Sequence, residues 1–468
     1  MQKILSVAIG LALAQFVSTP IFAADATEDF IDVNESLSLD NTSQAQTKTF
    51  NFGKNVIYTR NGKIALNGQG GKKDLTINVK NGSGDFIVRD RYAPIQLDNS
   101  DIHLKFNSNL VMEGMEYAGI MYSSGNVPRE LNITGDFIYR DSYATAIEAS
   151  TGNFRGNLFV ITIDGKADLR NVSIHGNGKT TASGSLLNLG ATDFEAKQGV
   201  FIDNIDGNTA GDWNTAIFLV NGSLKAENQN IEITNINFNV ASRVNTSIYV
   251  QSSPVKAKNI LIKGLTNKYD NDLYGYINGT EANTVSDSLT ICDIRNLKTG
   301  NSLALYMEAD SRSRYGDTNF NVGTLTIDNV VANDGIAEGM SVGGAARDNG
   351  KLNAQAGSVS INGVHGTRGA VGAEISDGAS FTSVNNFAVT DVKATAGDAI
   401  GLMLGAKTTV GDTLSVQKVR GTTSAVGVQF DGTQAFSSKV VQVKDIKASD
   451  GSAIGLLAHQ ANIGNLKD

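Results

Sequence analysis

The chain has 468 residues, which is enough for two or three ordinary domains or for one long repeat array. With 18% charged and 41% hydrophobic residues, its composition is neither that of a disordered chain nor that of a membrane-spanning one. A formal net charge of -8 argues against a nucleic-acid-binding protein, because phosphate binding needs clustered Lys and Arg. Cys292 is the single cysteine, so no intrachain disulfide can form.

The N-terminus has the pattern of an export signal. Lys3 supplies a positive charge, an apolar run extends from Ile4 to Val17, and Pro20 precedes a small residue, Ala23, at the expected cleavage point. The apolar run is shorter than the ~20 residues that a membrane-spanning helix needs. We therefore predict that residues 1–23 are a cleaved signal peptide.

Residues 24–190 contain two kinds of short apolar segment that suggest an irregular repeat. One kind resembles a first strand of each repeat and starts at Leu75, Ile102, Leu131 and Val172. The other kind resembles a second strand and opens with Tyr-Ala at Tyr92, Tyr117 and Tyr143.

Residues 191–468 contain a more regular repeat, in which three apolar residues occupy positions one, three and six of a six-residue motif. The nine copies start at Val200, Ile231, Ile260, Leu289, Leu325, Val359, Phe387, Leu414 and Val441, and the intervals between them are 27–36 residues. Apolar residues two apart lie on one face of a β-strand, so each copy predicts a strand with one buried face.

The fifth position of the motif predicts a bend. Eight of the nine residues there are Asn, Asp or Gly, and the ninth is Lys418. Asn, Asp and Gly tolerate a left-handed backbone, which lets the strand turn a corner while both flanking apolar side chains still point inward.

A second strand follows each corner after a variable loop. Two of these segments are near duplicates, from Lys393 to Gly405 and from Lys447 to His459, and both contain Ala-Ile-Gly-Leu. The small residue before the next apolar pair predicts close stacking against the neighbouring copy.

This pattern predicts an all-β fold, a right-handed parallel β-helix of about thirteen coils with a period of 27–36 residues. The expected parts are an irregular β-helix over 24–190 and regular coils over 191–468, open at the C-terminal end. Helical repeats are disfavoured because the apolar period is two, and leucine-rich repeats and propellers have other periods.

The signal peptide, the Gly- and Asn-rich β-helix, the scarce cysteine and the acidic charge together resemble the passenger region of a pertactin-like Gram-negative autotransporter. The resemblance implies export by the signal peptide and display at the outer membrane or cell surface, or extracellular release. Such passengers are followed by a membrane β-barrel, which this sequence does not contain before Asp468, where a further coil would begin.

The most distinctive loops follow the second strands of the copies at Leu289 and Leu325. In a β-helix both loops would emerge on the same side, one above the other, and would form a mixed-charge patch. The candidate binding residues are Glu308, Asp310, Arg312, Arg314, Tyr315, Asp317, Arg347 and Asp348, together with Trp213, the only tryptophan, which could stack on a sugar. Solvated loops that carry both charges for solubility are the simpler interpretation of this pattern.

Catalytic signatures are weak in this sequence. The four histidines lie far apart along the expected rod, and no serine-protease nucleophile motif or tandem calcium-binding repeat occurs. We expect a non-enzymatic, adhesin-like binding or structural rod without a cofactor. Its expected partners are a glycan or protein on a host or neighbouring cell, or another copy of the rod.

The alternative is a polysaccharide-active β-helix enzyme, either a lyase or a glycoside hydrolase. An acidic pair that faces one groove across adjacent coils would favour the enzyme. A groove lined by Ser, Thr and Asn would favour binding.

Overall fold

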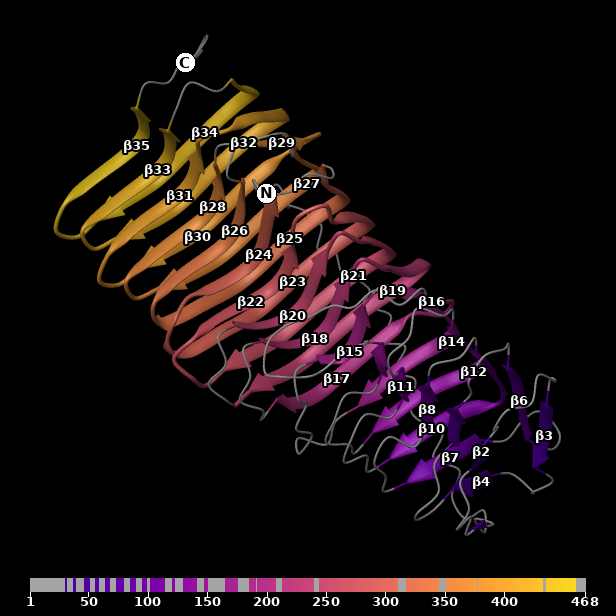
Figure 1. Ribbon diagram of the computed structural model, residues 1–468. Coiled ribbons are helices and arrows are strands. Elements are labelled where there is room, and N and C mark those ends of the chain that lie inside the picture. The colour runs from indigo at the N-terminus through magenta and orange to yellow at the C-terminus, as the bar shows by residue number, and fades with distance from the viewer. Residues whose placement is uncertain are drawn as a thin grey trace, which may run out of the picture.

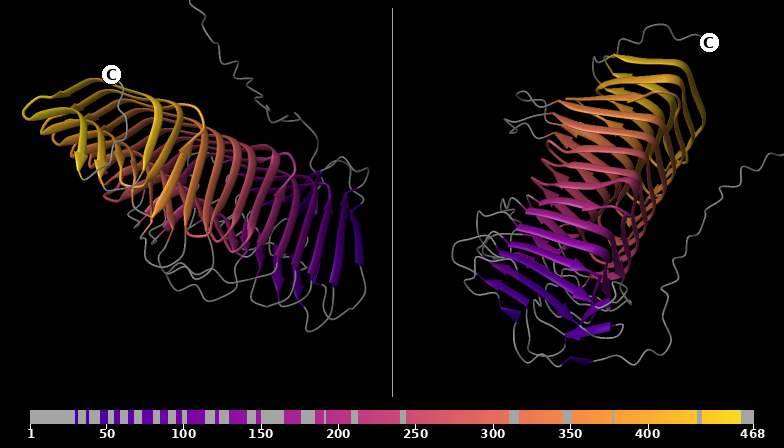
Figure 2. Two further views of the ribbon diagram at one scale, coloured as in Figure 1. Left: turned by 90° about the horizontal axis from the view of Figure 1, so that it is seen from above. Right: turned by 90° about the vertical axis from the view of Figure 1, so that its right-hand side faces the viewer.

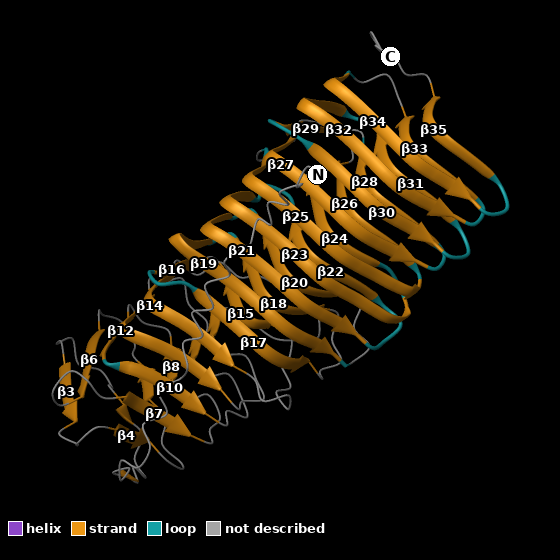
Figure 3. Ribbon diagram, turned by 180° about the vertical axis from the view of Figure 1, so that it is seen from behind, coloured by secondary structure: helices purple, strands orange, loops and turns teal. Residues whose placement is uncertain are grey.

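The chain forms a parallel β-solenoid, in which successive turns stack along one axis from the N-terminal to the C-terminal end (Figure 1). This computed structural model describes residues 30–31, 37–38, 46–50, 55–58, 64–67, 73–79, 85–89, 95–98, 102–113, 120–122, 129–140, 147–149, 165–175, 185–190, 192–207, 213–239, 244–309, 317–344, 351–376, 378–431 and 435–459. All regular structure in these residues is strand (Figure 3), and none of it is a helix that could cross a membrane.

Two parallel sheets build the solenoid. Sheet A has 20 strands: β1 (Phe30–Ile31), β3 (Gln46–Phe50), β4 (Asn55–Tyr58), β6 (Lys73–Val79), β7 (Asp85–Arg89), β9 (Ile102–Asn107), β10 (Asn109–Glu113), β12 (Arg129–Arg140), β14 (Gly165–His175), β16 (Thr192–Ala196), β17 (Val200–Gly207), β19 (Ser223–Phe238), β21 (Pro254–Asn267), β23 (Asn283–Thr299), β25 (Thr318–Asp334), β27 (Leu352–Gly366), β29 (Ala379–Ser383), β30 (Phe387–Ala394), β32 (Lys407–Gly421) and β34 (Phe436–Ala448).

Sheet B has 15 strands: β2 (Leu37–Ser38), β5 (Ile64–Asn67), β8 (Ile95–Asp98), β11 (Ile120–Tyr122), β13 (Ile147–Ala149), β15 (Ser185–Gly190), β18 (Trp213–Val220), β20 (Val244–Gln251), β22 (Asp272–Asn278), β24 (Ser302–Ala309), β26 (Ile336–Gly344), β28 (Gly369–Ile375), β31 (Asp398–Leu404), β33 (Ser424–Asp431) and β35 (Ser452–His459). The views in Figure 2 show how the strands of the two sheets wind around a common axis.

The predicted six-residue motif is the regular repeat of sheet A. Its nine copies pair with one another in chain order, so that Val200 is aligned with Ile231, Ile231 with Ile260, and so on to Val441. Each copy opens one of nine regular turns that run from Val200 to His459. The parallel solenoid predicted from the motif is confirmed.

All nine predicted corners adopt the left-handed backbone. Their φ angles lie between 54° at Asn235 and 72° at Gly264. Lysine is not a residue type that favours the left-handed backbone, yet Lys418 has a φ of 56° like the other corners. The corner is therefore a property of the turn, and a less favourable residue adopts it because the strands on both sides are fixed by pairing.

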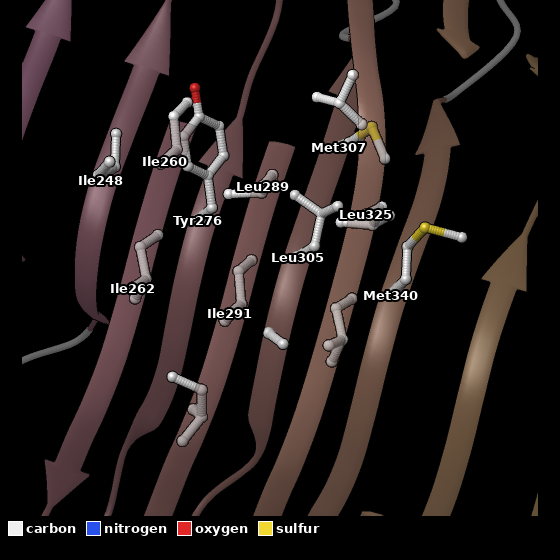
Figure 4. Close-up of a cluster of buried hydrophobic side chains, with 14 of the residues drawn as sticks. Ile248, Ile260, Ile262, Tyr276, Leu289, Ile291, Leu305, Met307, Leu325 and Met340 are labelled. Atoms are coloured by element: carbon white, nitrogen blue, oxygen red, sulfur yellow. The ribbon is translucent and has the colours of Figure 1, made fainter. Parts of the chain in front are cut away.

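Stacked apolar side chains fill the interior of the solenoid. A single buried cluster runs from Phe86 to Phe430, and it contains all three apolar positions of the first eight motif copies. Figure 4 shows how Ile260, Leu289 and Leu325 repeat the same position from turn to turn, with residues such as Leu305 and Met340 on the strands of sheet B. Burying each such side chain contributes roughly 1.5–3 kcal/mol, and the repeat supplies several of them per turn.

A column of small residues brings sheet B close to sheet A. A Cβ atom added at Gly401 would lie 2.3 Å from Cγ1 of Val416 in sheet A and 2.6 Å from the carbonyl oxygen of Gly427 on the next turn. Gly372 and Gly427 are equally crowded. Gly401 lies in the first of the two near-duplicate segments, which are two turns apart because Ala399 pairs with Ala425 and Ala425 with Ala453. The predicted close stacking is confirmed.

Of the four first strands predicted within residues 24–190, three are wrong. Val172 does align with Val200, as predicted. The backbones of Leu75, Leu104 and Leu131 instead align with one another and then with Ala167, in the strand that precedes the motif strand of each turn. The residues of these early turns that align with the first position of the motif are Phe86, Leu110 and Phe137. Two successive strands of one turn share the same alternation, so periodicity alone could not tell them apart.

The early second strands were assigned correctly. The Tyr-Ala segments lead into β8, β11 and β13, which pair in that order within sheet B. Six strands of sheet B precede β18, the first that belongs to a regular turn. The predicted count of about thirteen coils differs slightly from the structure, which has nine regular turns preceded by shorter and less regular strands.

Candidate functional site: the outer face of sheet B

The outer face of sheet A is largely polar, and several of its side chains hydrogen-bond to one another from turn to turn. Asn329 donates a hydrogen bond to Asp293 over 2.6 Å, and Asn362 donates one to Asp328 over 2.7 Å, each from one turn to the next. The middle residue of the motif, such as Thr290, Thr326 or Ser415, also points outward and is half-buried. We find no feature of this face that demands a ligand among the described residues.

The outer face of sheet B carries aromatic side chains on consecutive turns. Phe218 and Tyr249 pair across β18 and β20, with ring centroids 5.2 Å apart and an interplanar angle of 7°. Tyr274 of β22 and Tyr306 of β24 meet edge to face at 6.1 Å. Strand alternation explains this placement, because the residues on either side, such as Ile217 and Leu219, point into the core.

Carboxyl groups follow these aromatic side chains along the axis. Burial raises the pKa of Tyr249 to about 12, and the charge of Glu308 in β24 adds to this effect. Burial is also the main cause of the raised pKa of Tyr274 and Tyr306, and Glu308 contributes to both. Glu338 of β26 adds to the effect on Tyr274 and Tyr306. The rings and the carboxylates therefore belong to one cluster.

Glu338 is the most unusual residue of this cluster. Burial and the nearby charge of Glu374 raise the pKa of its carboxyl group to about 8, against the opposing effect of a hydrogen bond from Ser341. Its Oε1 atom has essentially no solvent-accessible surface and no hydrogen-bond partner. A buried carboxyl oxygen without a partner is costly, and such groups are common at functional sites.

Glu374 extends the cluster to the next turn. It lies in β28, where it pairs with Ser341 of β26 and is diagonal to Glu338. Burial and the charge of Asp431, which lies in β33, raise the pKa of Glu374 as well. We call Tyr249, Tyr274, Tyr306, Glu308, Glu338, Ser341 and Glu374 the acidic-aromatic face.

The predicted loop patch adjoins this face at one end. Glu308 and Ala309, which precede the first loop, pair with Gly343 and Gly344, which precede the second. The backbone N–H of Lys351 donates to Asp317 Oδ1 over 3.1 Å, so the ends of the two loops also meet. The loops therefore leave and rejoin the solenoid one above the other, as predicted. Asp310, Arg312, Arg314, Tyr315, Arg347 and Asp348 lie outside the described residues.

Trp213 and Ala23 were also among the predicted residues. Trp213 is the first residue of β18, and its backbone pairs with Val244, but its side chain lies outside the described part of the structure. Ala23 and the whole predicted signal peptide lie outside it too.

The histidines and the cysteine show no catalytic arrangement in the described strands. His365 lies 3.0 Å from the carboxylate of the corner residue Asp391, which is an exposed pair on sheet A. The pKa of the Cys292 thiol is raised to about 11, chiefly by burial, which makes it a poor nucleophile. Among the described residues, no three or more His, Cys, Asp or Glu side chains gather as a metal site.

Sequence reasoning missed Glu338, Ser341 and Glu374. They lie in the second strands, where Glu338 aligns with Leu303 and Val371 and where Ser341 and Glu374 follow Tyr306 in one row. An acidic residue at an outward strand position is ordinary. The signal that could have found them is the alignment of second strands, in which Glu308, Glu338 and Glu374 occur on three successive turns.

Comparisons with known proteins give no family for this chain: no family model, no curated protein and no solved structure matches it.

Proposed function

We propose that this protein is an exported, autotransporter-like passenger that acts as a non-enzymatic binding rod and engages its ligand with the acidic-aromatic face. The observation that carries the proposal is the contrast between the two outer faces. Sheet A presents polar side chains that pair with one another, whereas sheet B presents the partly exposed rings of Tyr249, Tyr274 and Tyr306 and an unpartnered carboxyl oxygen.

A rigid solenoid suits this role because it holds the same side-chain row at a fixed spacing. Strands in a sheet lie ~4.8 Å apart, so the rings of Tyr274 and Tyr306 on successive turns are in contact although they belong to different rows, Tyr274 opposite Leu303 and Tyr306 opposite Ile277. Aromatic residues are enriched where proteins bind partners, because a large ring is buried at a small cost in side-chain entropy.

The signal-peptide pattern of residues 1–23 supports export, and the parallel solenoid supports the likeness to autotransporter passengers. Cell-surface display is tested by adding a protease to intact Gram-negative cells that express the chain. Digestion of the chain without digestion of a periplasmic marker supports display, and protection until the outer membrane is opened contradicts it.

Binding is tested with the purified full chain on immobilised glycans and on fixed cells. Tyr306→Ala should weaken binding about tenfold by removing one stacking surface. The matched control is Thr326→Ala, which changes a half-buried outward residue of β25 in sheet A. Equal binding by wild type, Tyr306→Ala and Thr326→Ala would remove the acidic-aromatic face from the proposal.

A second candidate function is polysaccharide cleavage, because Glu338 and Glu374 are an acidic pair on adjacent turns. A glycoside hydrolase needs one protonated and one ionised carboxyl group, and unequal environments can supply both. Incubation with a panel of polysaccharides, followed by a reducing-end assay, tests this function. Product formation that Glu338→Gln abolishes would replace the binding rod with an enzyme.

A further inference from the structure

The acidic-aromatic face has a charge pattern that points to one class of ligand. The charged side chains that raise the pKa of Tyr274, Glu338 and Glu374 are acidic: Asp272, Glu338 and Glu308 act on Tyr274, Glu374 acts on Glu338, and Asp431 acts on Glu374. These residues come from β22, β24, β26, β28 and β33, so the pattern spans several neighbouring strands.

A second observation indicates that an interaction is missing. The Oε1 atom of Glu338 is enclosed and has no hydrogen-bond partner, although the carboxyl group accepts a bond from Ser341. Buried polar atoms are satisfied in most native proteins, and an exception requires an explanation. A ligand that donates a hydrogen bond to this oxygen would provide one.

We propose that the acidic-aromatic face binds a basic segment of a partner polypeptide, with an Arg or Lys side chain between Glu338 and Glu374 and beside the rings of Tyr274 and Tyr306. This inference rests on the proposed binding function and specifies its partner. Ionised carboxylates only accept hydrogen bonds, and a guanidinium group offers five donors in a plane. Tyrosine rings attract a cation that lies over their face. The net charge of -8 would also favour the approach of a basic partner.

The proposed complex has a characteristic pH dependence. The pKa of Glu338 is about 8 without ligand, so below that pH its carboxyl group must lose a proton before it can pair with a cation. Arg and Lys remain charged throughout this range. Affinity should therefore rise up to tenfold per pH unit as the pH approaches ~8 and then level off.

The experiment measures fluorescence anisotropy of a labelled oligoarginine peptide with the purified full chain from pH ~6 to pH ~9. A peptide with citrulline in place of arginine has nearly the same shape without the charge and should bind at least tenfold more weakly. Glu338→Gln should abolish the rise in affinity towards pH ~8, and Glu374→Gln should lower affinity while keeping part of the rise.

The control variant is Asp287→Asn, which removes an exposed negative charge from β23 in sheet A and should leave both affinity and pH profile unchanged. Because Glu374 is half-buried, its variant tests the site even where Glu338→Gln disturbs the fold, and thermal unfolding of each variant checks this.

Several results would overturn the inference. Equal affinity for the citrulline peptide would exclude a cation site, and oligoarginine affinity that Asp287→Asn lowers as much as Glu374→Gln would indicate a diffuse charge effect. Calcium or a neutral oligosaccharide that binds with the same dependence on Glu338 and Glu374 would assign the face to a different ligand.

The inference and the proposed function can fail separately. Binding to cells that depends on Tyr306, without oligoarginine binding, refutes the basic partner alone. Oligoarginine binding without any cell or glycan binding refutes the adhesin-like role.

Discussion

Sheets A and B differ in how they use their inner and outer positions, although they share one core. Sheet A bends at a left-handed residue in each regular turn, and on its outer face polar groups such as Asn362 and Asp328 pair from turn to turn. Sheet B has a column of crowded glycines on its inner side and a carboxyl oxygen without a partner on its outer side. The difference indicates that the outer polar groups of sheet A are satisfied by stacking from turn to turn, whereas the outer face of sheet B retains an unsatisfied carboxyl oxygen.

The largest effect is expected where sheet B is most crowded. Gly401→Ala should lower the free energy of unfolding by about 3 kcal/mol or more, because the new Cβ would overlap Cγ1 of Val416 and the carbonyl oxygen of Gly427. Chemical denaturation measures the change.

Gly369→Ala is the matched control for this prediction. At Gly369 of β28 the nearest atom to an added Cβ is Cγ1 of Ile336 at 3.5 Å, which is an ordinary contact. The change should stay within about 1 kcal/mol. Equal destabilisation by both variants would show that the column of small residues is not a packing constraint.

The second effect concerns the corners of sheet A. Asn329→Val should destabilise the protein by about 2–3 kcal/mol, since a β-branched residue strongly disfavours the φ of 57° and the hydrogen bond to Asp293 is lost. Asn329→Gly keeps the conformation and loses only the hydrogen bond, so it should cost about 1 kcal/mol. If the glycine variant unfolds as easily as the valine variant, the hydrogen bond rather than the backbone conformation holds the corner.

The third prediction concerns the difference between the outer faces of sheets A and B. The folded protein holds the proton of Glu338 up to a pH of about 8, against an ordinary pKa of 4.5, so stability falls as the pH rises between these values. Glu338→Gln removes this dependence and should stabilise the protein by on the order of 2 kcal/mol at neutral pH, with little effect at pH ~4.

Thermal unfolding at several pH values measures this gain, and Asp287→Asn on sheet A should show none. A Glu338→Gln variant that is destabilised at neutral pH would mean that the ionised carboxylate contributes to the fold, which would contradict the contrast between the two faces.

The local features of the fold were predictable because they depend on neighbouring residues. Alternation placed Ile231 and Ile233 inside, and the Asn at position 235 marked the bend between Ile233 and Ile236. The early strands show the limit of this reasoning. At Leu75 and Leu131 two consecutive strands have the same alternation, and only the pairing register assigned them.

Only the part of the candidate site next to the two loops could be predicted from the sequence. The two loops could be expected to stack because both follow second strands, and Glu308 connects them to the acidic-aromatic face. The electrostatic effect of Glu374 on Glu338 could not be expected, because it depends on the register between β26 and β28 and on how deeply each carboxyl group is enclosed.

The sequence by itself determined the period, the corners and the inward-facing residues of this protein, because these follow from backbone preference and from the two-residue repeat of a strand. The tertiary structure decided which outward residues became neighbours, since residues such as Tyr274 and Glu338 meet only when turns with loops of different length stack in register. The raised pKa of Glu338 and its unpartnered oxygen arise from that stacking.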